Sequence, residues 1–223
     1  MSLASCFPIW NKLPPEQQEH ILSVSEFRKV KAGTILHDGG PECMGLILVH
    51  SGQLRAYMLS SEGREVTITR FFEMDICLFS ASCVMPNMQF DIFISAEKDC
   101  ELWIIPACLY KNLIEESLPV ASYSYDLICN HFSELTWLMD QIMWKKFDER
   151  LAQFLIEESQ LEGSSSLVIT HDKIANHMGT AREVVTRMLR YFQSEGMVRL
   201  TRGTVEITDA KRLLALMNGQ LPA

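Results

Sequence analysis

Residues 120–147 form a long segment that contains no proline and no glycine. Because these two residues most often interrupt helices, the segment predicts one continuous helix. Apolar residues recur along it at alternating intervals of four and three positions, the heptad pattern of a two-stranded coiled coil. Pairing with a second copy of the chain is therefore favoured, and packing against the chain's own N-terminal part is the alternative. The stripe consists of Ile128, Phe132, Leu135, Met139 and Ile142.

The region between residues 30 and 105 has a different pattern, in which short apolar runs alternate with glycine-containing turns. Such closely spaced strand and turn signals predict a β-roll of the jelly-roll kind. Residues 54–59 and 64–70 are predicted to pair as a hairpin. Before this region, Pro14 and Pro15 suit a helix start, and a helix is predicted within residues 8–28. The predicted strand runs are 34–36, 45–49, 54–59, 66–72, 90–94 and 101–105.

After the long helix, the pattern predicts two helices separated by a short turn at Gly179. The second is predicted over residues 181–194, and Thr180 and Glu183 at its start have the spacing of a capping box. A helix, a turn and a second helix are the arrangement of a helix-turn-helix. A hairpin turning at Arg202 and Gly203 follows. The remaining predicted helices are 148–159, 171–178 and 209–217.

The two faces of the predicted helix 181–194 differ in chemistry. One face is apolar at helical spacing, which indicates the buried side. On the other face, arginine can donate two hydrogen bonds to guanine, and glutamate can accept one from the cytosine amino group. A surface pair between Glu183 and Arg187 is the plainer alternative. The polar face consists of Arg182, Glu183, Thr186, Arg187 and Arg190.

Charge is distributed unevenly along the chain. The net charge is −8 overall, but residues 170–223 carry eight basic and five acidic residues, a net of +3. A locally basic C-terminal part can bind a phosphate backbone while the acidic remainder favours solubility. No apolar run reaches the length of a membrane span, and no secretion signal precedes the β region, so a cytoplasmic protein is expected. The seven cysteines are correspondingly expected to be reduced.

Several enzymatic and metal sites are disfavoured. His37 and His50 stand apart without a His-x-His pair, so no metal site is predicted. No Ser-His-Asp set or phosphate-binding loop is found, and no enzymatic activity is predicted. Trp103, Trp137 and Trp144, with Met139 and Met143, could line a haem or small-ligand cavity, but core and dimer packing is the favoured interpretation.

Two stretches of the sequence resemble the Crp–Fnr family of bacterial transcription regulators. IANHMGTAREVVTRMLRYFQSEGMV resembles the family's DNA-binding unit, and AGTILHDGG with MGLILVHSGQLRAYMLSSEGREVTITRFF resembles its N-terminal β-roll. The resemblance implies an α+β fold: a jelly-roll-like β-roll sensor (1–118), a dimerisation helix (119–147) and a winged helix-turn-helix (148–223). It also implies that Arg182, Glu183 and Arg187 contact the bases of a GTGA-type half-site. Thr170 and Thr180 would lie near phosphates, and Arg202 would lie on the wing. Thr186 and Arg190, on the helix 181–194, would complete the DNA-binding surface.

The effector position departs from the family's cyclic-nucleotide binders. They hold the ribose with a Gly-Glu pair and the phosphate with an arginine, whereas Phe79, Ser80 and Phe90 occupy the matching positions here. Cyclic-nucleotide binding is therefore disfavoured, and the effector pocket is expected around Phe79, Ser80, Phe90 and Asp91. Only Cys6 lies near the N-terminus, so an iron–sulfur cluster is not indicated and no cofactor is predicted. Cys77 and Cys83 flank the pocket position and are a candidate redox pair, with plain burial as the alternative.

The sequence therefore predicts a homodimeric DNA-binding transcription regulator that reads a palindromic site. An unidentified small-molecule or redox signal in the β-roll would control it, and RNA polymerase would be a partner if it activates. The alternative is a redox or small-ligand sensing module that acts through protein partners.

Overall fold

The computed structural model describes residues 2–40, 43–84 and 91–220. The chain divides into two compact units, each described by itself. The N-terminal unit comprises Met1–Leu59 and Ile68–Leu135, and the C-terminal unit comprises Ser60–Thr67 and Thr136–Ala223.

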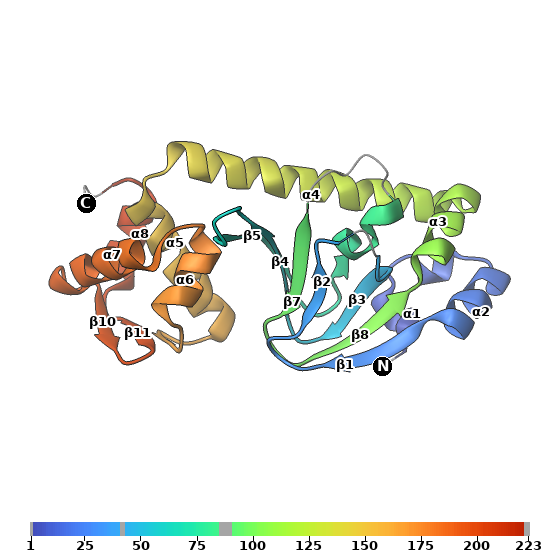
Figure 1. Ribbon diagram of the computed structural model, residues 1–223, viewed down its shortest axis with the longest axis horizontal. Coiled ribbons are helices and arrows are strands. Elements are labelled where there is room, and N and C mark those ends of the chain that lie inside the picture. The colour runs from blue at the N-terminus through green and yellow to red at the C-terminus, as the bar shows by residue number, and fades with distance from the viewer. Residues whose placement is uncertain (1, 41–42, 85–90, 221–223) are drawn as a thin grey trace. The chain divides into compact units, whose positions relative to one another are not determined.

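Two antiparallel four-stranded sheets build the N-terminal unit (Figure 1). Their inward-facing side chains, among them Ile47, Ile94 and Leu102, are buried and form one core. The predicted β-roll is confirmed, including the hairpin that begins at Leu54. One sheet has the order β1 (Glu26–Val30), β8 (Cys100–Ile105), β3 (Leu46–Ser51), β6 (Ile76–Cys77), and the other has β2 (Ile35–Asp38), β7 (Ile92–Ala96), β4 (Leu54–Leu59), β5 (Glu65–Phe71).

Helices pack against this roll through a second apolar cluster, in which Phe7 and Tyr110 are almost fully buried. The predicted N-terminal helix is shorter than expected, because α2 ends at Val24 and the chain enters β1 two residues later. β1 and β6 were not predicted. The helical elements of this unit are α1 (Leu3–Cys6), η1 (Trp10–Lys12), α2 (Pro15–Val24), η2 (Leu78–Val84), α3 (Ala107–Glu116) and the first part of α4 (Leu118–Trp144).

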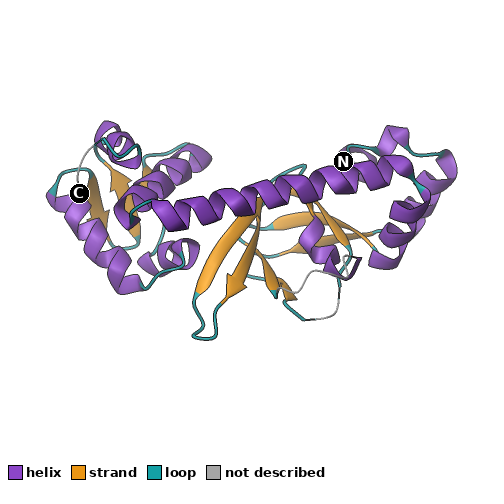
Figure 2. Ribbon diagram, turned by 90° about the horizontal axis from the view of Figure 1, so that it is seen from above, coloured by secondary structure: helices purple, strands orange, loops and turns teal. Residues whose placement is uncertain are grey.

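Helix α4 is a single unbroken helix, as the sequence predicts, but its predicted end at residue 147 is wrong (Figure 2). It ends at Trp144, and α5 begins at Phe147 after the two-residue joint Lys145–Lys146. The heptad stripe lies mostly on the surface of the single chain: Phe132 is 70% exposed and Met139 is 61% exposed. Ile128 and Ile142 are also exposed, whereas Leu135 is half-buried.

The C-terminal unit packs its helices and a three-stranded antiparallel sheet around a separate core. Leu151, Val185 and Leu189 lie at its centre and are completely buried. Its elements are α5 (Phe147–Glu162), β9 (Ser166–Leu167), α6 (His171–Met178), α7 (Arg182–Ser194), β10 (Val198–Thr201), β11 (Thr204–Ile207) and α8 (Ala210–Met217).

Within the described residues, no helix has the length and hydrophobicity needed to span a bilayer. Five cysteines, Cys6, Cys77, Cys100, Cys108 and Cys129, carry free thiols. Cys43 is in a disulfide bond, so the expectation that every cysteine is reduced is wrong for this residue.

Candidate DNA-binding surface

A sharp turn at Gly179 joins α6 to α7. Gly179 has a φ of +65° and closes α6, its amide donating to the carbonyl of Ala175. The positive φ favours glycine, and a Cβ atom here would lie 3.0 Å from Val66 Cγ2, so that side chain would have to shift slightly. At the other end of α6, the Thr170 hydroxyl accepts a hydrogen bond from the amide of Lys173 over 3.2 Å. This N-cap fixes where α6 begins.

The predicted capping box at the start of α7 is wrong. The N-cap residue is Ala181, which has no capping side chain, and the helix begins at Arg182. The Thr180 amide instead donates to the carbonyl of Ala175, which ties Thr180 to the end of α6. The turn is therefore closed from the α6 side, and the first amides of α7 receive no side-chain acceptor from its N-cap.

Helix α7 has the predicted two faces. Val185, Leu189 and Phe192 have no exposed surface and belong to the core. The opposite face is accessible: Arg182, Glu183, Arg187 and Arg190 are exposed, and Thr186 is half-buried. An exposed face with arginines and a carboxylate at helical spacing can meet the hydrogen-bonding edges of bases in a major groove.

Two contacts from α6 orient this exposed face. Asp172 Oδ2 lies 3.3 Å from Arg182 Nη1, and His171 Nδ1 lies 2.9 Å from Thr186 Oγ1. Burial, together with the positive charges of Arg182 and Arg190, lowers the pKa of His171, while Asp172 acts in the opposite direction. The imidazole therefore favours its neutral form, in which one ring nitrogen can accept from a hydroxyl.

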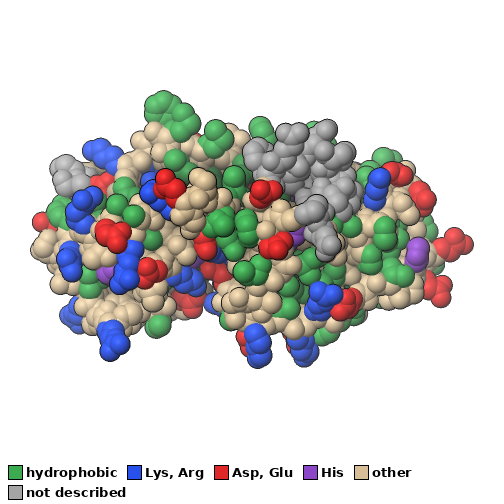
Figure 3. Space-filling model, viewed as in Figure 1, with side chains coloured by type: hydrophobic (Ala, Val, Ile, Leu, Met, Phe, Trp, Pro, Cys, Tyr) green, Lys and Arg blue, Asp and Glu red, His purple; other side chains and the backbone are tan. Residues whose placement is uncertain are grey.

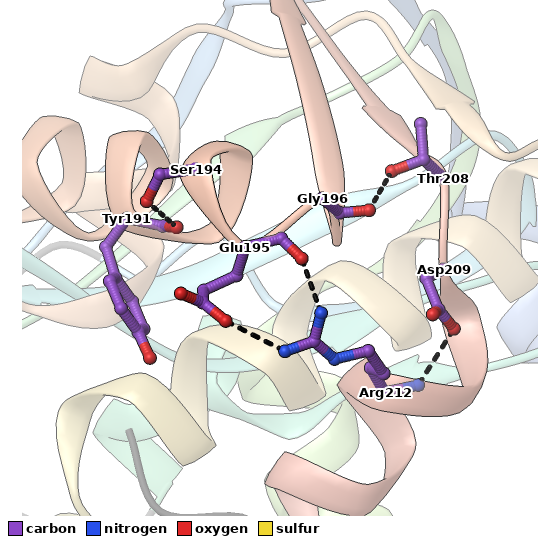
Figure 4. Close-up of polar contacts among 7 residues, drawn as sticks. All are labelled: Tyr191, Ser194, Glu195, Gly196, Thr208, Asp209 and Arg212. Carbon is purple, nitrogen blue, oxygen red and sulfur yellow. Dashed lines mark hydrogen bonds and ion pairs between the residues drawn. The ribbon is translucent and has the colours of Figure 1, made fainter.

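The far end of α7 is anchored by polar contacts (Figure 4). Arg212 of α8 donates to both the backbone carbonyl and the carboxylate of Glu195, the latter over 2.9 Å. Thr208 Oγ1 donates to the carbonyl of Gly196 over 2.8 Å, and the Asp209 carboxylate caps α8 by accepting from the Arg212 amide. These bonds hold the end of α7 and the start of the β10–β11 hairpin against α8.

The hairpin turns at the predicted residues. Thr201 pairs with Thr204, which leaves exposed Arg202 and Gly203, with a φ of +75°, as the two-residue turn. Lys and Arg side chains gather on the C-terminal unit in the view of Figure 3, with acidic side chains among them. The net positive charge is confined to residues 170–223, the part of this unit that includes α7 and the hairpin.

The residues predicted for an effector pocket mostly fill space themselves. Ser80 is fully buried, donates to the carbonyl of Cys77 over 2.6 Å, and accepts from the Ile47 amide. Phe79 is buried and stacks on His131 of α4, with 4.7 Å between ring centroids. Asp91 is exposed, and Phe90 lies outside the described residues.

The candidate redox pair receives no support from its described member. Cys77 is fully buried, and burial raises the pKa of its thiol to about 12. The reactive thiolate is therefore scarce at neutral pH. The side chain of Cys83 lies outside the described part of the chain.

The comparisons with known proteins agree with this architecture. The profile of the Crp-like helix-turn-helix domain matches residues 149–216, and that of the cyclic nucleotide-binding domain matches residues 27–117. A solved structure from Eubacterium rectale, assigned to the Crp–Fnr family of transcriptional regulators, is 53% identical. It superimposes with a TM-score of 0.94, covering 96% of this chain and 99% of the other.

Curated relatives are more distant. The "Cyclic AMP receptor protein" of Thermus thermophilus is 27% identical, covering 92% of this chain and 94% of that protein. The "Transcriptional activator protein anr" of Pseudomonas aeruginosa is 25% identical over 89% of this chain and 83% of that protein. Fold and surface define a winged helix-turn-helix DNA-binding regulator with a cyclic-nucleotide-binding-like β-roll. The chain belongs to the Crp–Fnr family of transcription regulators.

Besides the short strand β9, sequence reasoning missed two features of the C-terminal unit that bear on function. The contact of Asp172 with Arg182 joins two helices, and the aspartate alone carried no signal beyond its place in the first turn of α6. The second is a cavity beside Gln141 and Arg150, which requires three helices to be placed before it exists.

Proposed function

We propose that this chain is a homodimeric regulator that reads a palindromic DNA site with one α7 helix per half-site. Arg182, Glu183 and Arg187 would contact bases, and Thr186 and Arg190 would border them. Thr170 and Thr180 would approach phosphates, and Arg202 on the wing would contact the flanking backbone. If the dimer activates transcription, RNA polymerase would be a further partner.

The exposed polar face of α7 is the single observation that carries this proposal. Its arginines and carboxylate are accessible, while the opposite face is buried and the helix is anchored at its end through Arg212. A rigidly held helix whose bidentate donors point outward is suited to direct readout of guanine.

Selection of bound duplexes from a random DNA pool tests base recognition. We expect a palindrome with G-containing half-sites, and Arg187→Ala should lose about 1–3 kcal/mol of discrimination at one base pair per half-site. Arg28→Ala, which removes an exposed arginine of the N-terminal unit, is the matched control and should leave the preference unchanged. An unaltered sequence preference in Arg187→Ala would show that Arg187 does not contribute to base recognition.

Dimerisation through α4 is supported by its exposed apolar side chains. Ile128, Phe132, Met139 and Ile142 lie on the surface of the single chain, where water contact disfavours them. A second α4 packed along the stripe would cover them with the side chains of a like helix, as in a coiled coil.

Sedimentation of Phe132→Glu tests that interface. The variant should shift from dimer to monomer at micromolar concentration, because two carboxylates would be buried near the two-fold axis. Glu19→Gln, which changes an exposed carboxylate of α2, serves as the control. A Phe132→Glu protein that sediments as the wild type would place the dimer interface elsewhere.

The signal would enter through the β-roll and change the joint that precedes Phe147. Two states that differ in how the C-terminal units are presented would bind the palindrome unequally, and a ligand would act by favouring one of them. A redox sensor that acts through protein partners is the weaker candidate, since Cys77 is buried and its pKa is raised to about 12.

A further inference from the structure

The C-terminal unit contains a cavity of about 120 Å³ among the end of α4, α5, the end of α6 and Val66 of β5. Its lining includes Trp137, Gln141, Arg150, Phe154 and Met178. The polar side chains of the lining are Gln141, Arg150, Gln153, Glu157 and His177. Glu157 already has a partner, because its Oε1 atom accepts a hydrogen bond from Gln153 Nε2 over 2.7 Å. The cavity also borders the joint between α4 and α5, since it takes residues from both sides of Lys145–Lys146.

Two polar atoms at this cavity are left without a partner. Gln141 is 8% exposed, and its Oε1 atom accepts no hydrogen bond from the described residues. Arg150 Nε is also buried and donates to no acceptor among them. Buried polar atoms are almost always paired, so an unpaired acceptor and an unpaired donor at one cavity indicate a missing occupant.

The positive charge of Arg150 indicates the charge of the missing ligand. Desolvation lowers the pKa of the Arg150 guanidinium. Glu157, the carboxylate in the lining, is hydrogen-bonded to Gln153, and among the described residues it forms no ion pair with Arg150. The guanidinium carbon of Arg150 lies 5.7 Å from the centroid of the Phe147 ring. A partly buried arginine without a counter-ion favours an anion, and a carboxylate matches its planar donors.

The size and the lining of the cavity limit which ligand can occupy it. An apolar protein cavity of roughly 150 Å³ holds a benzene molecule, so this one suits an apolar body no larger than a benzene ring. The cavity is open to solvent on one side, so the polar substituents of such a body can extend beyond the enclosed volume. Trp137, Phe154 and Met178 offer aromatic and thioether surfaces to such a body. Gln141 Oε1 requires in addition a hydroxyl or amino donor.

We propose that this cavity binds a small organic carboxylate with a compact apolar body and one hydrogen-bond donor, of the size of a hydroxybenzoate. Its carboxylate accepts from Arg150, its body lies against Trp137 and Phe154, and its hydroxyl donates to Gln141. Because the occupant contacts both α4 and α5, it favours one geometry of the Lys145–Lys146 joint. This regulatory consequence rests on the proposed DNA-binding function, whereas the binding site does not.

Tryptophan fluorescence of the full-length protein measures the binding directly, because Trp137 lines the cavity. We expect benzoate and 3-hydroxybenzoate to change the emission in a saturable way, with 3-hydroxybenzoate tighter and neutral benzyl alcohol at least tenfold weaker than benzoate. Trp137→Phe should remove the signal. No saturable change with either acid up to 10 mM would overturn the site, as would equal affinity for benzoate and benzyl alcohol.

Two variants test the assigned contacts. Arg150→Gln should weaken benzoate at least tenfold and leave benzyl alcohol unchanged, and Gln141→Leu should remove the advantage of 3-hydroxybenzoate over benzoate. Arg199→Gln, which removes an exposed arginine from the same unit, is the control. Thermal melting of each variant shows whether the unit is folded. Folded Arg150→Gln that binds benzoate like the wild type would contradict the proposal.

DNA affinity, measured with and without 3-hydroxybenzoate, separates the site from its consequence. A several-fold change that Arg150→Gln abolishes supports regulation at the joint. Saturable fluorescence with unchanged DNA affinity overturns the regulatory consequence alone. Saturable fluorescence in a protein that binds no DNA would refute the proposed function and leave the site standing.

Discussion

Replacing Asp172 by asparagine should strengthen DNA binding while slightly weakening the fold. In the free protein the Asp172 carboxylate lies 3.3 Å from Arg182, and both side chains are about 60% exposed, at 61% and 62%. Asp172 thus occupies an arginine that would otherwise be available to a base or phosphate. It also places a negative charge on the surface that must approach the DNA backbone.

The loss of stability should be small. An exposed ion pair contributes about 0–1 kcal/mol, since solvent screens it and both side chains lose freedom. Asp172 also lies in the first turn of α6, where a negative charge adds about 0.3–1 kcal/mol. Asp172→Asn should therefore lower the free energy of unfolding of the C-terminal unit by about 1 kcal/mol.

The gain in DNA affinity has two sources of similar size. A carboxylate about 8 Å from one phosphate costs about 0.5 kcal/mol in water by Coulomb's law. Release of Arg182 from an exposed pair returns about another 0.5 kcal/mol. Together they give about 1 kcal/mol, or roughly fivefold tighter binding.

Fluorescence anisotropy with the selected duplex, at several salt concentrations, measures this gain. It should shrink as salt rises, because screening weakens both contributions. Asp99→Asn is a matched control, since Asp99 forms an exposed pair with Lys31 in the N-terminal unit. Weaker or unchanged binding by Asp172→Asn at low salt would show that the carboxylate does not compete with DNA.

Three further predictions concern stability. Leu189→Ala, at a completely buried position of α7, should cost about 2–5 kcal/mol in urea unfolding of the C-terminal unit; a loss below about 1 kcal/mol would contradict its place in the core. Gly52→Ala should destabilise the β-roll by about 2–5 kcal/mol, because Gly52 has a φ of +96° and a Cβ there would lie 2.4 Å from the Asp99 carbonyl oxygen; calorimetry would test this. The folded-state pKa of His171 is lowered from 6.5, mainly by burial, so the unfolded chain binds the proton more readily and stability should fall as pH drops below about 6.5. Denaturation between pH 5 and 8 should show a shallower fall in His171→Gln, and identical profiles would refute this assignment.

Elements with a strong local pattern were predicted well from sequence. Helix α7 was predicted within one residue of its start because its apolar positions repeat at helical spacing, and β4 was predicted with its observed bounds. β1 was missed because Glu26–Val30 is polar and exposed, without the alternation that marks a half-buried strand. β6 is two residues long, too short for any periodicity.

The candidate site was predictable only in its local part. The exposed residues of α7 follow from the helix period, and the Arg202–Gly203 turn follows from hairpin chemistry. The capping box was wrong because Thr180 has its amide bonded to Ala175 and lies before the true N-cap. Spacing identifies residues that could cap, but it does not show which residue leaves the helical conformation.

The exposed heptad stripe on α4 also determines how DNA occupancy would depend on the concentration of the regulator. Since Phe132 and Met139 are exposed in the single chain, pairing would bury them, and the fraction of paired chains would rise with protein concentration by mass action. If only pairs occupy the palindrome, occupancy at low expression grows with the square of the number of chains. The number of chains would then need to rise about ninefold to move a promoter from roughly 10% to 90% occupancy, where a regulator that binds as a single chain would need about 81-fold.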